Sequence, residues 1–149
     1  MSEAEAFLAE LSEGLDRDER LILCGFPGDP YEAGPAAWKP KPWRSGSEFP
    51  FRELDNAYVT VSGFKRAADN TYRRRTETFG CGLALMVDDV GTKVDRAFVE
   101  EMQPTWKIET SPGNEQWWYF LDQPERDMIR FDGLIRAFIS GKLLGADPG

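Results

Sequence analysis

An almost uninterrupted apolar run, residues 81–87, constrains the fold of this chain more than any other stretch. Such runs are typical of central strands buried on both faces, where the usual alternation of polar and apolar residues is lost. The run ends on two adjacent carboxylates, Asp88 and Asp89, and Gly91 follows at a point where the chain can turn sharply. The sequence therefore predicts a core strand with two acidic side chains at its end.

The two aspartates cannot both face one ion while the strand stays regular, because successive side chains point to opposite faces. Either the strand ends at Asp88, or a bulge turns Asp89 round. Carboxylates held in this way are hard oxygen ligands suited to Mg²⁺ or Mn²⁺. A turn carrying two solvated acids is the other interpretation, and the spacing alone leaves it open.

A pair of strands joined by a turn is predicted over residues 105–121. Its centre, residues 111–114 (Ser-Pro-Gly-Asn), fits a type II turn with Gly113 at positive φ. A hairpin closed by this turn places Glu109 opposite Gln116 and Lys107 opposite Trp118. This polar face suits a nucleotide, with Trp118 either stacking on a base or packing in the core, whereas we assign Trp117 to the core.

Two segments have the apolar spacing of amphipathic helices. Residues 2–15 follow this spacing with Ser2 as a suitable N-cap. Residues 124–143 follow it more strongly, with Pro124 at the first helical position. Residues 94–103 have weaker helical or 3₁₀ character. We therefore expect helices near both ends of the chain.

Shorter apolar segments predict further strands over 21–26 and 56–64. Between them, residues 27–50 hold six of the ten prolines and form a long irregular loop, which we expect three aromatic side chains to pin down. These are Trp38, Trp43 and Phe49. No linker divides the sequence, so we expect a single α+β domain over residues 1–149.

Composition excludes several kinds of chemistry. The chain has no histidine, which removes Ser-His and Cys-His catalysis and His-ligated zinc. Its net charge of −8 argues against a passive nucleic-acid coat, which would normally be basic. No apolar run approaches the length of about 18 residues needed to span a membrane, and the acidic N-terminus lacks a signal-peptide core. We expect a cytoplasmic protein without a membrane partner.

Basic residues concentrate in one segment of this acidic chain. Five of the 18 lie within eleven positions: Lys65, Arg66, Arg73, Arg74 and Arg75. A solvated charged loop is one interpretation. The other is a contact to phosphate or to a nucleic-acid template, since the cluster concentrates positive potential in one place.

Taken together, these motifs resemble RepB-type primases of plasmids, phages and mobile elements, within the archaeo-eukaryotic primase superfamily. The resemblance covers about residues 55–149. It depends on the segment 56–61, the arginines 73–75, the segment 87–93, the hairpin 109–119 and two later segments, 131–138 and 145–147.

The resemblance implies a primase-type core with an RRM-like, mainly antiparallel sheet flanked by helices. It implies DNA replication chemistry, namely metal-dependent, template-directed nucleotidyl transfer that makes short primers on single-stranded DNA with Mg²⁺ or Mn²⁺. Asp88 and Asp89 match the first acidic motif and Asp147 the later one, so these three carboxylates are the expected catalytic and metal-binding residues.

Further roles follow from the same resemblance. The expected nucleotide-binding residues are Ser111, Gly113, Asn114, Gln116, Trp118 and Lys93. The expected template or phosphate contacts come instead from the concentration of basic charge, and they are Lys65, Arg73, Arg74 and Arg75. Much of the superfamily carries a histidine in the middle motif, where this chain has Gln116. Nucleoside triphosphates, single-stranded DNA and a helicase domain or protein are the expected partners.

Two alternatives to an active primase stay open at this point. One is a catalytically inactive primase-fold module used for docking or regulation in a replication or phage protein. The other is a nuclease that uses the same carboxylates. The family pattern continues beyond the position of Asp147 with a basic segment, so a fragment or a natural truncation is expected.

Overall fold

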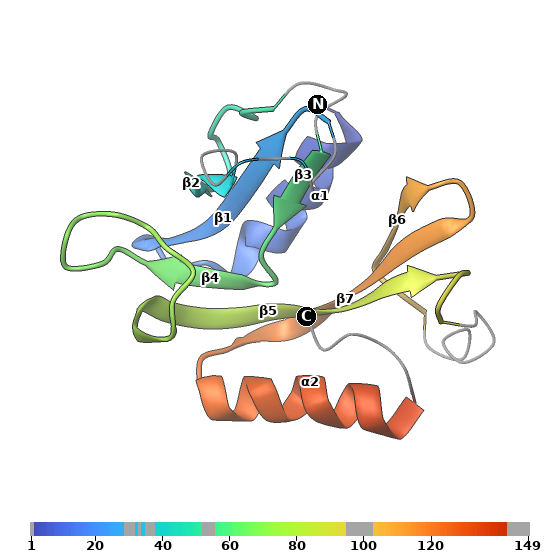
Figure 1. Cartoon of the computed structure of the whole chain (residues 1–149). Coiled ribbons are helices and arrows are strands. Elements are labelled where there is room, and N and C mark those ends of the chain that lie inside the picture. Colours follow the sequence, from blue (N-terminus) through green and yellow to red (C-terminus); the bar gives the residue numbers. More distant parts are fainter. Residues whose placement is uncertain are drawn as a thin grey trace. The chain divides into compact units, whose positions relative to one another are not determined.

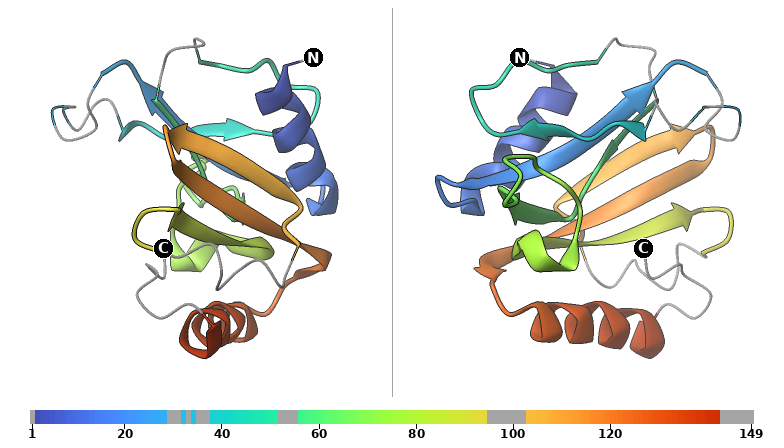
Figure 2. Two further views of the ribbon diagram at one scale, coloured as in Figure 1. Left: turned by 90° about the vertical axis from the view of Figure 1, so that its right-hand side faces the viewer. Right: turned by 60° about the vertical axis from the view of Figure 1, so that its left-hand side comes forward.

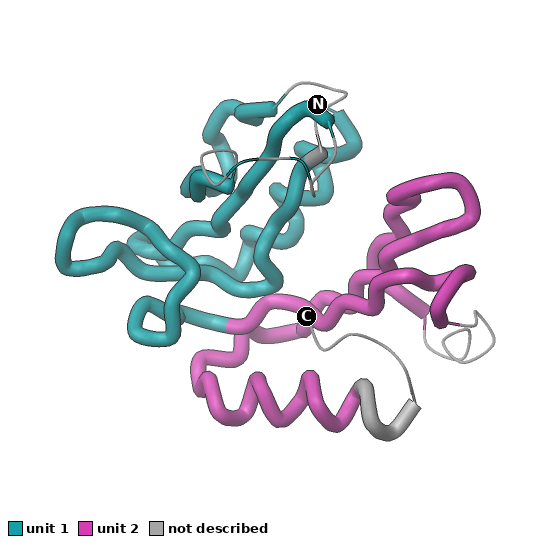
Figure 3. The backbone as a smooth tube through the Cα atoms, viewed as in Figure 1, with its two compact units in different colours: residues 1–81 teal, residues 82–149 magenta. Residues whose placement is uncertain are grey.

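The computed structural model describes residues 2–28, 32, 34, 38–51, 56–94 and 103–142. The chain divides into two compact units, Met1–Cys81 and Gly82–Gly149 (Figure 3). The fold class is α+β, as predicted, with antiparallel strand pairs and two α-helices in the described part of the chain.

The first unit begins with helix α1, Glu3–Leu11, followed by the 3₁₀ turn η1, Ser12–Gly14. The hydroxyl of Ser2 accepts a hydrogen bond of 3.2 Å from the backbone N–H of Glu5 and so caps the helix as predicted. Phe7, Leu8 and Leu11 are buried, which explains the apolar spacing in this segment.

Strand β1, Glu19–Phe26, is the centre of the first unit. It pairs antiparallel with three short strands: β2 (Lys41–Trp43), β3 (Asn56–Val59) and β4 (Ser62–Lys65) (Figure 1). The order in this unit is β2-β1-β4-β5, and β3 also pairs with β1. Leu21 and Leu23 of β1 are buried in the core of the unit, and the predicted strand over 21–26 is confirmed.

The strand predicted over 56–64 is interrupted at Thr60, so this prediction was wrong in its continuity. The Thr60 hydroxyl accepts a hydrogen bond of 3.2 Å from the Ile22 N–H and donates one of 2.8 Å to the Ser62 carbonyl. These bonds occupy backbone groups that regular pairing would use, and β3 ends before β4 begins. Side-chain alternation is lost across the break, because Tyr58 is exposed while Ser62 is buried.

Strand β5, Phe79–Val90, follows the 3₁₀ turn η3, Thr76–Thr78, and continues into the second unit. There it pairs with β7, Asn114–Glu125, which also pairs with β6, Trp106–Ser111. Figure 2 shows these strands as a twisted antiparallel ribbon. Val87, Val90, Val94 and Trp117 form one buried cluster in this unit, with Tyr119 and Phe138 packed against it.

Helix α2, Met128–Lys142, begins four residues later than the predicted start at Pro124. Strand β7 continues through Pro124 to Glu125. The carboxylate of Asp127 then accepts hydrogen bonds from the backbone N–H groups of Ile129 at 2.9 Å and Arg130 at 3.3 Å. Asp127 is therefore the N-cap, and its bonds set the start of the helix.

Replacing Asp127 with alanine is expected to lower the free energy of unfolding by about 1 kcal/mol, because two N–H groups of the first turn lose their acceptor. Equilibrium urea unfolding followed by circular dichroism measures this change. Asp127→Asn keeps the acceptor oxygen and serves as the control. Equal losses for both variants would show that the cap oxygen is not what matters.

Helix α2 contacts its own unit through Phe131 and Phe138. Phe131 is buried, and a Cβ built at Gly82 would overlap its ring, so the ring lies directly against the β5 backbone. Ile129 and Leu134, by contrast, are exposed.

Among the described residues, no helix is long and apolar enough to span a membrane. Most of the weak helix predicted over 94–103 falls outside the described residues.

Candidate functional site

The aspartate pair lies on a β-bulge in the second unit. Val87 pairs with Trp117 and Val90 with Glu115, so three steps along β5 match two steps along β7. The extra residue falls at Asp88–Asp89, and Asp89 has a φ of 57°. Of the two alternatives left open by the sequence, the bulge is the one that forms. The strand end at Asp88, which Gly91 favoured, was wrong, because β5 continues to Val90.

The contacts around the bulge fix the two carboxylates differently. Asp88 Oδ1 accepts a hydrogen bond of 2.8 Å from the N–H of Asp89. Asp89 Oδ1 accepts one of 3.2 Å from Asn114 Nδ2, and its Oδ2 lies 3.8 Å from Lys93 Nζ. The Asn114 amide oxygen accepts in turn from the Thr92 hydroxyl. The hairpin turn and the segment after β5 thus converge on Asp89.

A tight turn carries Thr92 and Lys93 to this position. The N–H of Gly91 donates to the Val94 carbonyl at 2.8 Å, and the N–H of Val94 donates to the Asp89 carbonyl at 3.0 Å. Gly91 has a φ of 97°, a conformation that glycine adopts without strain. Val94 is buried at the end of the turn, so the turn is anchored in the core of the unit.

The hairpin forms where predicted, but its register is shifted by one residue. Gly113 has a φ of 78°, as the predicted turn requires. Glu109 pairs with Glu115 rather than Gln116, and Lys107 pairs with Trp117 rather than Trp118, so the predicted pairs were wrong. The cause is an extra residue, Thr110, whose hydroxyl accepts from Asn114 Nδ2 at 3.0 Å and donates to the Asn114 carbonyl at 3.2 Å.

Trp118 lies in the core, 2% exposed, and presents no open ring face to a nucleotide. Its Nε1 donates a hydrogen bond of 3.3 Å to the side-chain oxygen of Gln116. Trp117 is buried, as assigned from the sequence, and the Lys107 ammonium lies 4.3 Å from its ring centre. Of the expected nucleotide-binding residues, Lys93, Ser111 and Gly113 are exposed, and Asn114 is half-buried.

The third expected carboxylate, Asp147, lies outside the described residues. Within the described residues, no group of three or more His, Cys, Asp and Glu side chains is arranged to hold a metal ion. Asp88 and Asp89 offer carboxylate oxygens, the ligand type that Mg²⁺ and Mn²⁺ prefer. The chemistry of this donor pair therefore fits such an ion.

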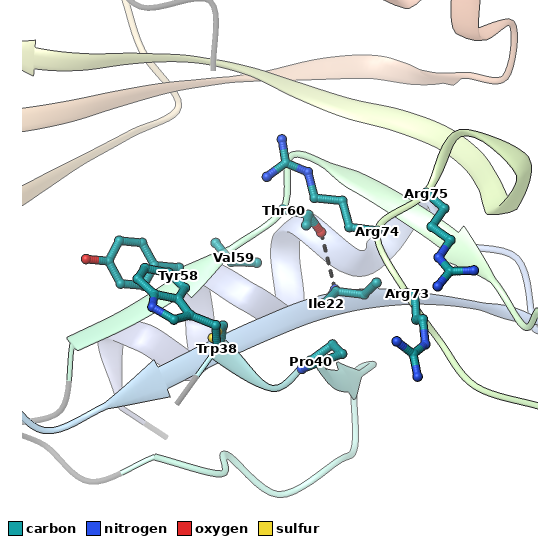
Figure 4. Close-up of a pocket in the computed structure, with 10 residues that line it drawn as sticks. Ile22, Trp38, Pro40, Tyr58, Val59, Thr60, Arg73, Arg74 and Arg75 are labelled. Atoms are coloured by element: carbon teal, nitrogen blue, oxygen red, sulfur yellow. Dashed lines mark hydrogen bonds between the residues drawn. The ribbon is translucent and has the colours of Figure 1, made fainter. Parts of the chain in front are cut away.

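The predicted template contacts lie in the first unit, where three of them line one pocket. Arg73, Arg74 and Arg75 border a pocket of about 380 Å³ between the loop that carries them and strands β1 and β3 (Figure 4). Arg73 Nε donates to the Thr71 hydroxyl at 3.2 Å. Lys65 is exposed on β4 and is not part of the pocket lining described.

Two aromatic residues in this pocket were not predicted as site residues. Trp38 and Tyr58 lie side by side with ring centres 5.1 Å apart, and both pack against the buried ring of Phe26 (Figure 4 shows the outer two). Tyr58 lies in the strand predicted over 56–64, and Trp38 is followed by Lys39 and Lys41. These features of the sequence are compatible with a binding site, but neither of them indicates that the two rings meet.

The chain thus has an acidic group in one unit and an aromatic and basic pocket in the other. The first can hold a cation beside a hairpin turn, and the second can bind anions that carry flat rings. No protein-family model, curated protein or solved structure matches the chain.

Proposed function

We propose that this chain is a primase-type domain that carries out metal-dependent, template-directed nucleotidyl transfer on single-stranded DNA. The observation that supports this most is the bulge at Asp88–Asp89, which sets two adjacent carboxylates beside the turn of a hairpin. Both aspartates are only partly buried, and two negative charges side by side disfavour each other. A cation is the natural compensation for such a pair.

The carboxylates of Asp88 and Asp89 would hold Mg²⁺ or Mn²⁺, and Asp147 would complete the set. Such an ion, when bound, supplies charge stabilisation at the α-phosphate of an incoming nucleotide and at the attacking 3′-hydroxyl. Lys93, with its ammonium exposed and 3.8 Å from Asp89, would neutralise the triphosphate. Asn114 orients the Asp89 carboxylate from the hairpin side.

The remaining partners follow from the same proposal. Nucleoside triphosphates would bind at the hairpin turn, near Ser111 and Gly113. Single-stranded DNA would contact the arginines 73–75, and a helicase domain or protein would supply it. The setting would be the cytoplasm, in the replication of a plasmid, phage or other mobile element.

A primer-synthesis assay tests the proposal. The chain is incubated with single-stranded DNA, labelled nucleotides and Mg²⁺ or Mn²⁺, and the products are separated by length. We expect products that require the template and disappear when EDTA removes the ion. Products that form without template, or that persist in EDTA, contradict the proposal, and shortening of the template instead identifies a nuclease.

A second candidate is an inactive primase-fold module used for docking or regulation. It is favoured by the position of Lys93 and Asn114, which partly compensate the charge of Asp89 without any ion. Mn²⁺ titration followed by tryptophan fluorescence separates the two candidates, because Trp117 pairs with Val87 directly before the bulge. A response at micromolar to millimolar Mn²⁺ supports the first candidate, and no response supports the second.

A further inference from the structure

We infer that Trp38, Tyr58 and the arginines 73–75 form a binding site for single-stranded nucleic acid, in which the rings stack on a base and the guanidinium groups hold phosphates. The pocket that they line lies entirely in the first unit (Figure 4). Such a site deepens the proposed function. It rests on that function only in one respect, namely that the ligand is taken to be a template strand. It adds the residues that contact the bases.

Phe26 holds both outer rings in place. The Trp38 ring meets Phe26 edge-on at 4.7 Å, and Tyr58 stacks over Phe26 at 6.0 Å, with Phe26 itself buried. Trp38 remains 43% exposed and Tyr58 41% exposed. Large aromatic side chains usually bury most of their surface. Here the packing fixes both rings and still leaves ring surface open to a base.

The charge of the pocket favours a phosphate-bearing ligand. Among the described residues, its lining contains three guanidinium groups and no carboxylate, although the whole chain has a net charge of −8. Arginine binds phosphate through two parallel hydrogen bonds, which makes it the usual choice for such contacts. Positive charge in an otherwise acidic protein also draws an anionic strand to one place.

A neighbouring turn orders the loop that carries the arginines. Asp69 accepts hydrogen bonds from the hydroxyl of Thr71 at 2.6 Å and from its N–H at 3.1 Å. These bonds lower the pKa of Asp69, and the charges of Arg73 and Arg75 lower it further. Thr71 in turn accepts from Arg73 Nε. The loop is thus tied down on the side of Asp69.

The shape of the pocket favours a strand over a free nucleotide. A volume of about 380 Å³ lies at the lower end of small-molecule sites and suits one base with its sugar. The three arginine side chains extend in different directions in Figure 4. Phosphates spaced along a strand can use diverging guanidinium groups, whereas one triphosphate would need them to converge.

Fluorescence anisotropy of a labelled oligothymidylate tests this inference. In buffer with EDTA and without nucleotides, Trp38→Ala and Tyr58→Ala are each expected to weaken binding roughly 5- to 150-fold, the cost of losing one stacked base. Both side chains are half-exposed, and unchanged circular dichroism confirms that the variants fold. A failure of primer synthesis leaves this result untouched, since the assay contains no metal ion and no substrate.

The arginines are tested by salt dependence. Replacing Arg73, Arg74 and Arg75 together with glutamine should reduce the slope of log affinity against log salt by about 2, given about 0.7 per phosphate contact on single strands. The control replaces Arg126, Arg130 and Arg136, which removes the same charge from the second unit. An equal reduction in the control shows only a general charge effect and overturns the inference.

Two further measurements identify the ligand. Cys24 lines the pocket, so the bound oligonucleotide should slow alkylation of its thiol. An abasic strand of the same length should bind more weakly, by a factor similar to that of Trp38→Ala. Equal affinity for the abasic strand overturns the stacking role, and a mononucleotide that binds as tightly as the oligomer overturns the assignment to a strand.

Discussion

Replacing Asp88 and Asp89 together with asparagine is expected to reduce primer synthesis about a thousandfold, because the site loses the charges that hold the ion and with them several kcal/mol of transition-state stabilisation. Asparagine keeps the acceptor oxygens that bond the Asp89 N–H and Asn114 Nδ2. It also tolerates the positive φ of residue 89. The double variant should therefore fold normally.

The control for this variant is Asp122→Asn, an exposed aspartate on β7 in the same unit. It removes one negative charge away from the bulge and should synthesise primers at the rate of the unmodified chain. Urea unfolding of all variants confirms that stability is unchanged. Undiminished synthesis by the double variant would falsify the assignment of these two carboxylates to catalysis.

Replacing Gly82 with alanine is expected to lower the free energy of unfolding by about 3 kcal/mol. A Cβ at this position overlaps the ring of Phe131, so either β5 shifts or the ring leaves its place. Overpacking a filled core costs about 1–3 kcal/mol, and exposing a buried phenylalanine costs about as much. Helix α2 should lose its main buried contact with the sheet in the process.

The same substitution at Gly133 provides a control with the opposite sign. Gly133 lies in α2, and a Cβ there meets no atom within 4 Å. Alanine should stabilise the helix by about 1 kcal/mol, because glycine is the weaker helix former. Equilibrium urea unfolding compares the two variants directly. A Gly82→Ala variant as stable as the unmodified chain would show that Phe131 does not depend on this backbone position.

That the strand must either bulge or end at the aspartate pair could be predicted from sequence, because it follows from a local rule, but the choice between the two could not. Side chains alternate along a strand, so two adjacent carboxylates need a bulge or a strand end to act together. The apolar run before them also predicted a core strand, and Ala84 and Val87 are indeed buried. Both inferences depend on neighbours in the sequence and on no distant contact.

The hairpin register could not be predicted in the same way. The turn at Gly113 was readable, but the extra residue Thr110 is held by side-chain bonds to Asn114 that no residue pattern announces. A single inserted residue then moved every predicted pair by one position. This shift gives Trp117, rather than Trp118, as the partner of Lys107.

The start of α2 depended on a choice between two valid signals. Proline suits the first position of a helix, which favoured Pro124, whereas aspartate suits the N-cap, which favours Asp127. The cap determined the outcome because β7 uses Pro124 near its end.

The pairing of the two pocket rings could not be predicted, for a different reason. Trp38 and Tyr58 meet because both pack against Phe26 at the end of β1, and no local pattern in the sequence announces this contact.

The left-handed backbone at Asp89 has a consequence for how related sequences will vary. A φ of 57° admits aspartate, asparagine and glycine with little strain, while most other residues are disfavoured. If folding alone limited this position, those three residues would interchange freely in homologues. Asp88 has no such backbone restriction, so the substitutions accepted at position 88 report on charge, and strict retention of aspartate at both positions would mark a lineage that depends on the carboxylates themselves.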